Sequence, residues 1–80
     1  MIVTPDILRE LLIEAGVDPA VARAVNPGAP LLRQGIDSLD FPAFCLAVEN
    51  RFSLSIDDRS SLSLKTLDDF AAYIGRGLDD

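Results

Sequence analysis

The fold of this chain is decided by residues 35–52, GIDSLDFPAFCLAVENRF, which join a glycine-punctuated loop to an amphipathic helix. The apolar residues recur at helical spacing and predict a helix over about 38–52. Ser38 stands where this helix starts. Unpaired backbone N–H groups and the positive end of the helix dipole would there stabilise a phosphate group on the serine hydroxyl. The simpler interpretation is that Asp37 and Ser38 only cap the helix, and the two roles are compatible.

The segment before this helix also has a helical pattern. Thr4 followed by Pro5 is typical of a helix start, and an apolar stripe then continues to Gly16, where we expect the helix to end. Asp18-Pro19 is expected to start a further short turn that runs through Val21 to Val25. The sequence NPGAP, residues 26–30, then breaks the regularity and predicts a long loop that reaches about residue 37.

The C-terminal third of the chain predicts two more helical pieces. A short turn is expected near 58–61, and a last helix is expected to be capped by Thr66 and stopped by Gly75 and Gly77. No pair of strands with a hairpin turn is visible. We therefore expect an all-α bundle of three to four helices, with a long loop between the first and second long helices.

Size and charge limit the classes of function. The chain has 80 residues, of which 49% are hydrophobic and 25% charged, so we expect a single domain over residues 1–80. A net charge of −6 opposes binding to nucleic acid or anionic membranes and favours partners with basic faces. No apolar run is long enough for membrane insertion and no leader pattern is visible, so we expect a cytoplasmic protein.

The chemistry-bearing residues argue against an enzyme. The chain has one cysteine and no histidine, which removes an internal disulfide, most metal sites and the usual catalytic triads. Cys45 lies among apolar residues at helical spacing and is interpreted as a reduced core thiol. The paired carboxylates of the C-terminal half stand at helix starts or at the chain end, away from any nucleophile. We therefore expect no catalytic residues and no metal site.

The motif over residues 35–40, followed by a helix that closes on Phe52, resembles the carrier motif of acyl carrier proteins. The resemblance continues through 56–58 and 66–74 and so covers nearly the whole chain. It implies that a phosphopantetheinyl transferase attaches 4′-phosphopantetheine to Ser38, with Asp37 helping at the transferase metal centre and Leu39 packing against that enzyme. The thiol of the attached arm would hold acyl groups as thioesters.

The resemblance also implies a docking face on the second long helix, including its first turn. We expect this face to meet acyl-loading and acyl-using enzymes that have basic or apolar docking faces, and to comprise Leu39, Asp40, Ala43, Leu46, Ala47, Glu49 and Asn50. Ala43 and Asn50 stand where the family has acids, so we expect weaker electrostatic steering and more apolar contact. A carrier that visits several enzymes is expected to be a monomer.

The family also receives the bound acyl chain between its helices. Candidate lining residues are Phe41, Phe44, Leu46, Phe52, Ile56, Leu62, Leu64 and Ile74, although apolar residues at helical spacing are more often ordinary core.

Two residues depart from the family pattern. Pro42 removes a backbone donor near the helix start and is expected to displace or kink it. If Asp40 acts as the cap, Ser38 lies on the loop outside the helix. Arg33 brings a positive charge toward Ser38, either as a solvated loop residue or as a contact for the prosthetic phosphate or an acidic partner.

Three functions remain open from the sequence. The first is an acyl carrier that delivers intermediates to fatty-acid, lipid or polyketide enzymes. The second is an aminoacyl or peptidyl carrier, which Gly35-Ile36-Asp37-Ser38 favours less. The third is an unmodified helical interaction domain that has kept the scaffold.

Overall fold

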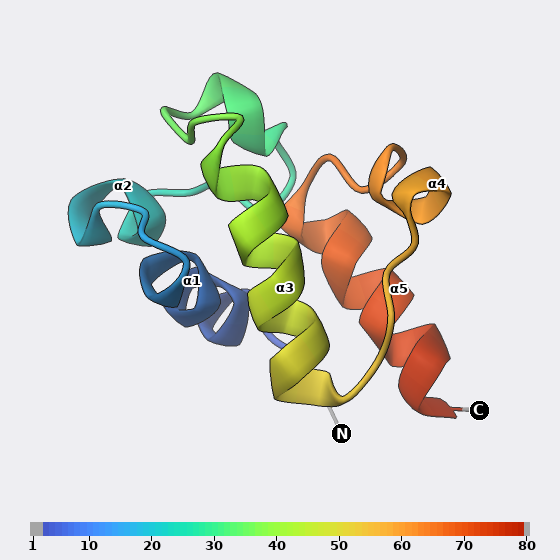
Figure 1. Cartoon of the computed structure of the whole chain (residues 1–80). Helices are drawn as coiled ribbons and strands as arrows, with labels where there is room; N and C mark the ends of the chain where they lie inside the picture. Colours follow the sequence, from blue (N-terminus) through green and yellow to red (C-terminus); the bar gives the residue numbers. More distant parts are fainter. Residues whose placement is uncertain (1–2, 80) are drawn as a thin grey trace.

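The computed structural model describes residues 3–79, and within that range it contains helices and no strand (Figure 1). The elements in chain order are α1 (Pro5–Glu14), α2 (Pro19–Arg23), the 3-10 helix η1 (Leu31–Arg33), α3 (Asp40–Phe52), α4 (Asp58–Ser61) and α5 (Leu67–Asp79). The expected all-α bundle is confirmed, with α1, α3 and α5 as its long members. The long loop also lies where it was predicted, and η1 lies within it.

Side-chain caps explain why the long helices α1 and α5 begin where they do. The Ile7 amide donates to Thr4 Oγ1 at 3.4 Å, and Pro5 follows as the first residue of α1. At α5 the capping is reciprocal. The Asp69 amide donates to Thr66 Oγ1 at 3.0 Å, while Asp69 Oδ2 accepts from the Thr66 amide at 3.1 Å. This capping box confirms the predicted start of the last helix.

Two predicted helix boundaries are wrong. α5 continues through Gly75 and Gly77 to Asp79, because a glycine inside a helix keeps its backbone hydrogen bonds and costs only about 1 kcal/mol relative to alanine. α3 begins at Asp40 rather than at residue 38, with Leu39 as its cap residue. Pro42 has no N–H to donate to the carbonyl of Ser38, so the α-helical hydrogen bond that would include Ser38 cannot form.

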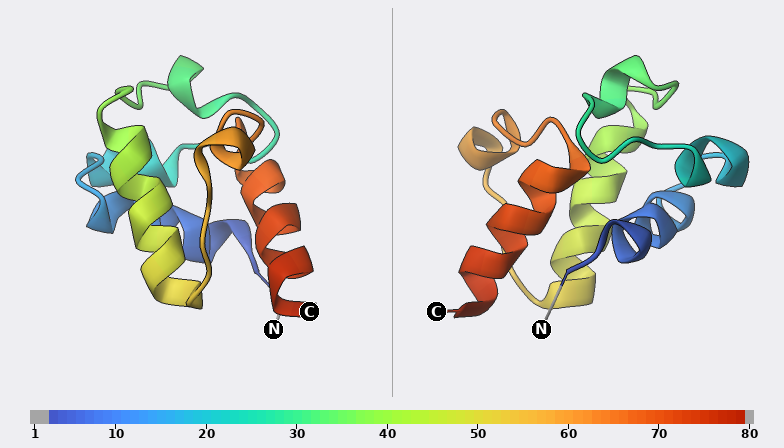
Figure 2. Two further views of the ribbon diagram at one scale, coloured as in Figure 1. Left: turned by 45° about the vertical axis from the view of Figure 1, so that its right-hand side comes forward. Right: turned by 180° about the vertical axis from the view of Figure 1, so that it is seen from behind.

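The core lies between α1, α3 and α5. The largest fully buried side chains among the described residues are Phe44, Phe70, Leu8, Leu12, Leu31, Leu67, Ile74, Val25 and Val48. Phe44 of α3 and Phe70 of α5 meet edge to face with ring centroids 4.7 Å apart. Figure 1 shows α3 and α5 side by side, and the rear view in Figure 2 shows α1 packed across them.

The long loop between α2 and α3 is held by hydrogen bonds at several points. The Gln34 side chain accepts from the Asn26 amide at 2.7 Å and donates to the Asn26 and Ala29 carbonyls at 3.1 and 3.0 Å. The Leu31 amide donates to the Lys65 carbonyl at 2.8 Å, which ties the loop to the connection between α4 and α5. These bonds gather the loop, the start of α3 and the α4–α5 connection at one end of the molecule (Figure 1).

Candidate functional site

Ser38 lies on an exposed turn immediately before α3. Asp37 Oδ1 accepts from the Leu39 amide at 2.9 Å, and the Asp37 carbonyl accepts from the Asp40 amide at 2.9 Å. Asp37 therefore takes the capping role at this turn. Within the described part of the chain the Ser38 hydroxyl makes no hydrogen bond, so its oxygen is free to react.

The turn is displayed by the residues that precede it. Gly35 has a φ of +85°, a conformation that a residue with a Cβ rarely adopts, and it turns the chain so that Ile36 enters the core with only 4% of its surface exposed. Ile36 anchors one side of the turn and Phe44 of α3 anchors the other. Ser38 is thus held outward between two buried side chains.

This geometry fits a covalently attached phosphodiester. The attachment oxygen is exposed, the backbone next to it is rigidly held, and the N-terminus of the 13-residue helix α3 lies two residues further along the chain. The partial positive charge of that helix end offsets part of the negative charge of the nearby carboxylates of Asp37 and Asp40. No buried pocket is needed, since the group would extend from the surface.

The predicted docking face divides into two parts in the structure. Leu39 and Leu46 are 81% and 57% exposed, which is unusual for large apolar side chains. They belong to one stripe, which we call the outer stripe of α3 and its preceding turn: Leu39, Asp40, Ala43, Leu46, Ala47 and Asn50. Asn50 is exposed, whereas Asp40, Ala43 and Ala47 are half-buried.

Glu49 was expected on the docking face but has a different environment. Its Oε2 atom accepts from the Ile56 amide at 2.9 Å, and its side chain is half-buried. Across the same segment, the Tyr73 hydroxyl donates to the Ser55 carbonyl at 3.0 Å. Glu49 therefore helps to fix the connection between α3 and α4, and its carboxylate is less available to a partner than a free surface acid.

Cys45 is half-buried on α3. Burial raises the pKa of its thiol above the ordinary value, and the neighbouring charge of Glu49 raises it further. A raised pKa keeps the thiol protonated and weakly nucleophilic at neutral pH. The interpretation of Cys45 as a packing residue is consistent with this environment.

The candidate lining residues for an acyl chain are dispersed by the structure. Phe44, Phe52, Leu64 and Ile74 are buried in the core, Phe41 and Ile56 are half-buried, and Leu46 and Leu62 are exposed. Phe41, Leu62 and Leu64 come together in a surface groove of about 580 Å³, which we call the η1–α4 groove. Its lining residues are Pro30, Leu32, Arg33, Phe41, Ser61, Leu62, Leu64 and Lys65.

Sequence reasoning missed this groove because its two walls are more than twenty-five residues apart in the chain. The hydrogen bond between the Leu31 amide and the Lys65 carbonyl holds them together, as does the burial of Leu31 and Leu64 in the same core. It also missed Gln34, whose side chain organises the loop. A lone glutamine in a loop gives no periodic signal that would have singled it out.

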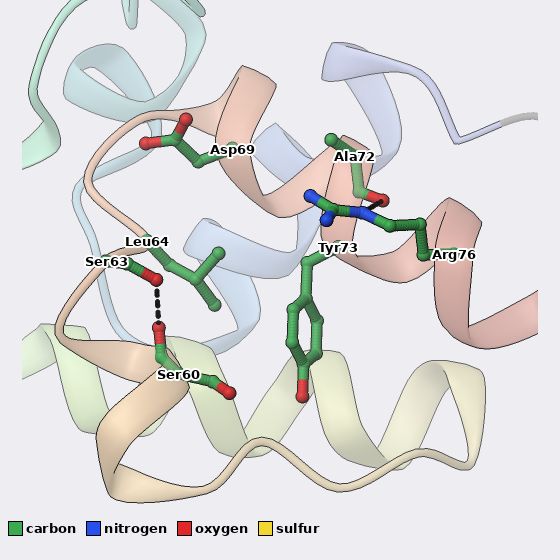
Figure 3. Close-up of a pocket in the computed structure, with 7 residues that line it drawn as sticks. All are labelled: Ser60, Ser63, Leu64, Asp69, Ala72, Tyr73 and Arg76. Atoms are coloured by element: carbon green, nitrogen blue, oxygen red, sulfur yellow. Dashed lines mark hydrogen bonds between the residues drawn. The ribbon is translucent and has the colours of Figure 1, made fainter.

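A second hollow, of about 310 Å³, lies between α4 and α5 (Figure 3). Several of its polar groups already have partners. The Ser63 hydroxyl donates to the Ser60 carbonyl at 2.9 Å, and Asp69 accepts the amides of Lys65 and Thr66. Arg76 Nε reaches the Ala72 carbonyl at 3.5 Å. These groups stabilise the local chain, and no ligand chemistry follows from them.

Among the described residues, no group of three or more histidine, cysteine, aspartate or glutamate side chains could hold a metal ion. Of the helices in that range, none combines the length and the apolar character that crossing a membrane requires.

Comparison with known proteins agrees with the geometry at Ser38. The family model described as Phosphopantetheine attachment site matches residues 6–74, which includes every long helix at least in part. Such a match defines the class as a helical carrier domain for a covalently attached phosphopantetheine. A relative from Bdellovibrio bacteriovorus, named Acyl carrier protein, is 34% identical over 74 residues, which cover 92% of this chain and 92% of the relative.

The chain belongs to the acyl carrier protein family. Members of this family are carriers and not enzymes, and their cofactor is 4′-phosphopantetheine. Membership also implies interaction with a phosphopantetheinyl transferase and with acyl-handling enzymes.

Proposed function

We propose that Ser38 is the attachment residue for 4′-phosphopantetheine and that the chain delivers acyl groups to enzymes of fatty-acid, lipid or polyketide assembly. The observation that carries this proposal is the free, exposed Ser38 hydroxyl on the turn before α3, in a chain of the acyl carrier protein family. When bound, the group supplies the thiol on which acyl groups are held as thioesters.

The attachment reaction needs little from this chain. The Ser38 oxygen forms a bond to the phosphorus that carries the pantetheine of coenzyme A, the diphosphate linkage breaks, and adenosine bisphosphate leaves. The transferase supplies the base that takes the hydroxyl proton, because this chain has no histidine and no basic group is hydrogen-bonded to Ser38 in its described part. This chain positions the nucleophile.

Asp37 and Leu39 support that positioning. One oxygen of Asp37 holds the turn through the Leu39 amide, and the other has no hydrogen bond within the described residues. The second oxygen is therefore available to a metal ion on the transferase. Leu39, with 81% of its surface exposed, offers an apolar contact directly beside the reacting hydroxyl.

Docking of the acyl-handling enzymes is assigned to the outer stripe of α3. The stripe combines two exposed leucines with one carboxylate, that of Asp40, so a partner face with apolar pockets and a basic rim would complement it. Glu49 contributes less than the sequence indicated, because it binds the Ile56 amide. We propose that the chain acts as one carrier domain, as a monomer, in the cytoplasm.

The proposal is tested by intact mass before and after incubation with coenzyme A and a broad-specificity phosphopantetheinyl transferase. Wild type should gain the mass of one phosphopantetheine group. Ser38→Ala should gain none, whereas Ser55→Ala, which removes another exposed serine hydroxyl, should gain the same mass as wild type. A folded, initially unmodified wild type that gains no mass would leave a helical interaction domain as the function.

A second experiment separates the two carrier classes. The loaded protein is incubated with fatty-acyl ligases and with amino-acid ligases, and the thioester that forms is identified by mass. Fatty-acyl loading is the expected result. Loading with amino acids alone would make the chain an aminoacyl or peptidyl carrier.

A further inference from the structure

The η1–α4 groove combines an apolar floor with two positive charges. Leu32 and Leu62 on its walls are 55% and 77% exposed, so two large apolar side chains face solvent across a hollow of about 580 Å³. Exposed apolar side chains that line one hollow are typical of a ligand-binding groove. The positive charges belong to Arg33 and Lys65.

Neither cation forms an ion pair inside the described part of the chain. Arg33 and Lys65 are exposed, and their side chains form no ion pair or hydrogen bond with the residues described there. The nearest acids in sequence to Lys65 are Asp68 and Asp69. The Asp69 carboxylate is bound by the amides of Lys65 and Thr66, and the charge of Lys65 is the smallest of the causes that lower its pKa. In a chain with a net charge of −6, two cations lining one apolar groove form a distinct local field.

The groove lies within reach of an arm attached to Ser38. Phe41 lines it and follows Ser38 by three residues, so the two Cα atoms are at most about 11 Å apart. The ring of Phe41 is fixed by an edge-to-face contact with Phe70, at 5.9 Å between centroids. An extended phosphopantetheine arm is longer than this separation, and the acyl group lies at its far end.

The prosthetic phosphate itself is a poor match for these cations. Phosphorus would be bonded directly to Ser38, and neither Ser38 nor any other residue from 34 to 40 lines the groove. Two carboxylates, those of Asp37 and Asp40, flank the attachment point, and the partial positive charge at the start of α3 offsets them only in part, whereas Arg33 and Lys65 attract an anion in the groove. Charge along this surface therefore changes from negative at the attachment point to positive where the cargo would lie.

We propose that the η1–α4 groove retains acyl groups that carry a free carboxylate at their distal end, with Arg33 and Lys65 binding the carboxylate and Leu32, Phe41 and Leu62 covering the carbon chain. This inference rests on the proposed attachment at Ser38 and adds the chemical class of the cargo. Arg33 and Lys65 thereby become specificity-determining residues. An acyl group of the same length that ends in a methyl group satisfies the apolar walls but leaves both cations in water.

The test compares two cargoes of equal carbon number, one ending in a carboxylate and one in a methyl group. Each is attached to the arm through an amide in place of the thioester, so that it cannot hydrolyse, and is loaded at Ser38 by the transferase. NMR signals of the Leu32 and Leu62 methyl groups and of the Lys65 amide are compared with those of the protein carrying the arm alone. The carboxylate cargo should shift these signals, and the methyl cargo should shift them less.

Variants identify the residues responsible. Replacing both cations, Arg33→Gln with Lys65→Gln, should reduce the shifts caused by the carboxylate cargo about fivefold, the effect of losing two exposed ion pairs. Arg59→Gln is the control for each of the two single replacements, Arg33→Gln and Lys65→Gln, because it removes one positive charge from α4 at a residue that does not line the groove, and it should leave the shifts unchanged. A second check needs no variant. Added sodium chloride screens the exposed charges and should therefore weaken the shifts that the carboxylate cargo causes in the wild-type protein.

Several results would overturn the inference. These are equal shifts from both cargoes, no groove shifts from either, or shifts already complete with the arm alone, which would assign the cations to the prosthetic group. Groove shifts caused only by adding the transferase to unloaded protein would make the groove a protein-docking surface. Failure to load Ser38, seen by mass, overturns the proposed function together with this inference, whereas loading without groove shifts overturns the inference alone.

Discussion

At the scale of single residues, the turn at Asp37–Leu39 assigns to different residues two roles that the sequence could not separate: holding the turn and offering a free hydroxyl. Asp37 accepts the Leu39 amide and so caps the turn, while the Ser38 hydroxyl stays free. A serine that capped the helix itself would have its oxygen engaged by a backbone amide. The free hydroxyl therefore favours modification of Ser38, because Asp37 holds the turn and Ser38 takes no part in holding it.

Gly35 is the residue on which the display of Ser38 depends most directly. Its φ of +85° is strained for any residue with a Cβ, so Gly35→Ala should destabilise the protein by about 1–2 kcal/mol in urea unfolding. A Cβ here would lie 3.6 Å from Val21 Cγ1, an ordinary contact, so the cost comes from the backbone. Unchanged stability would show that the turn can adopt another conformation.

Gly75 provides the matched control for this prediction. It lies inside α5, has no positive φ, and a Cβ there would meet no atom within 4 Å. Gly75→Ala should therefore raise stability by up to about 1 kcal/mol, because alanine is the better helix former. Destabilisation by both substitutions would contradict the assignment of strain to Gly35.

At the scale of elements, the start of α5 is sensitive to acid. Backbone hydrogen bonding from Lys65 is the largest cause that holds the pKa of Asp69 below its ordinary value, and bonding from Thr66 adds to it. The ionised form is thus favoured in the folded state. Its stabilisation is present above the unfolded pKa, about 3.9, and is lost as pH falls through the lower folded pKa.

Asp69→Asn should therefore weaken the loss of stability in acid. An asparagine carbonyl can still accept the two amides but does not titrate. Between about pH 5 and 3, the number of protons taken up on unfolding should therefore fall by up to one, and the slope of unfolding free energy against pH should fall in proportion. Urea unfolding across this range measures the slope. Asp68→Asn is the control, since the Asp68 side chain accepts no hydrogen bond from the described residues, and an equal change there would contradict the prediction.

The short helix α4 has the same kind of acid-sensitive start. The Ser60 amide donates to Asp57 Oδ1, and this bond is the largest cause that lowers the pKa of Asp57. α4 has no buried residue, so its position relies on such local bonds and on its flanking anchors at Ile56 and Leu64. One wall of the η1–α4 groove is thus formed by α4, a helix that has no buried residue of its own.

At the scale of the whole molecule, Phe70 joins the elements that carry the site. It is fully buried on α5 and meets both Phe41 and Phe44 of α3 edge to face. Phe70→Leu removes both aromatic contacts and leaves a small cavity, so it should destabilise the protein by about 1–3 kcal/mol. In a chain of 80 residues this is a large fraction of the total stability.

Tyr73→Phe is the matched control on the same helix. It removes only the hydroxyl that donates to the Ser55 carbonyl, and the expected loss is about 1 kcal/mol or less. Thermal and urea unfolding of both variants measure the difference. A Phe70→Leu variant no less stable than Tyr73→Phe would show that the aromatic cluster is not what holds α3 to α5.

Local sequence patterns predicted the three long helices and their caps at Thr4 and Thr66, because capping and helical periodicity act over three to four residues, but they misplaced the start of α3 and the end of α5. Tertiary structure decided the rest. Only packing shows that Glu49 is bound by Ile56, that Gln34 closes the long loop, and that residues 30–33 meet 61–65 to form a groove lined by two cations. These contacts join residues distant in the chain, and no local pattern of residue types encodes which distant pair will meet.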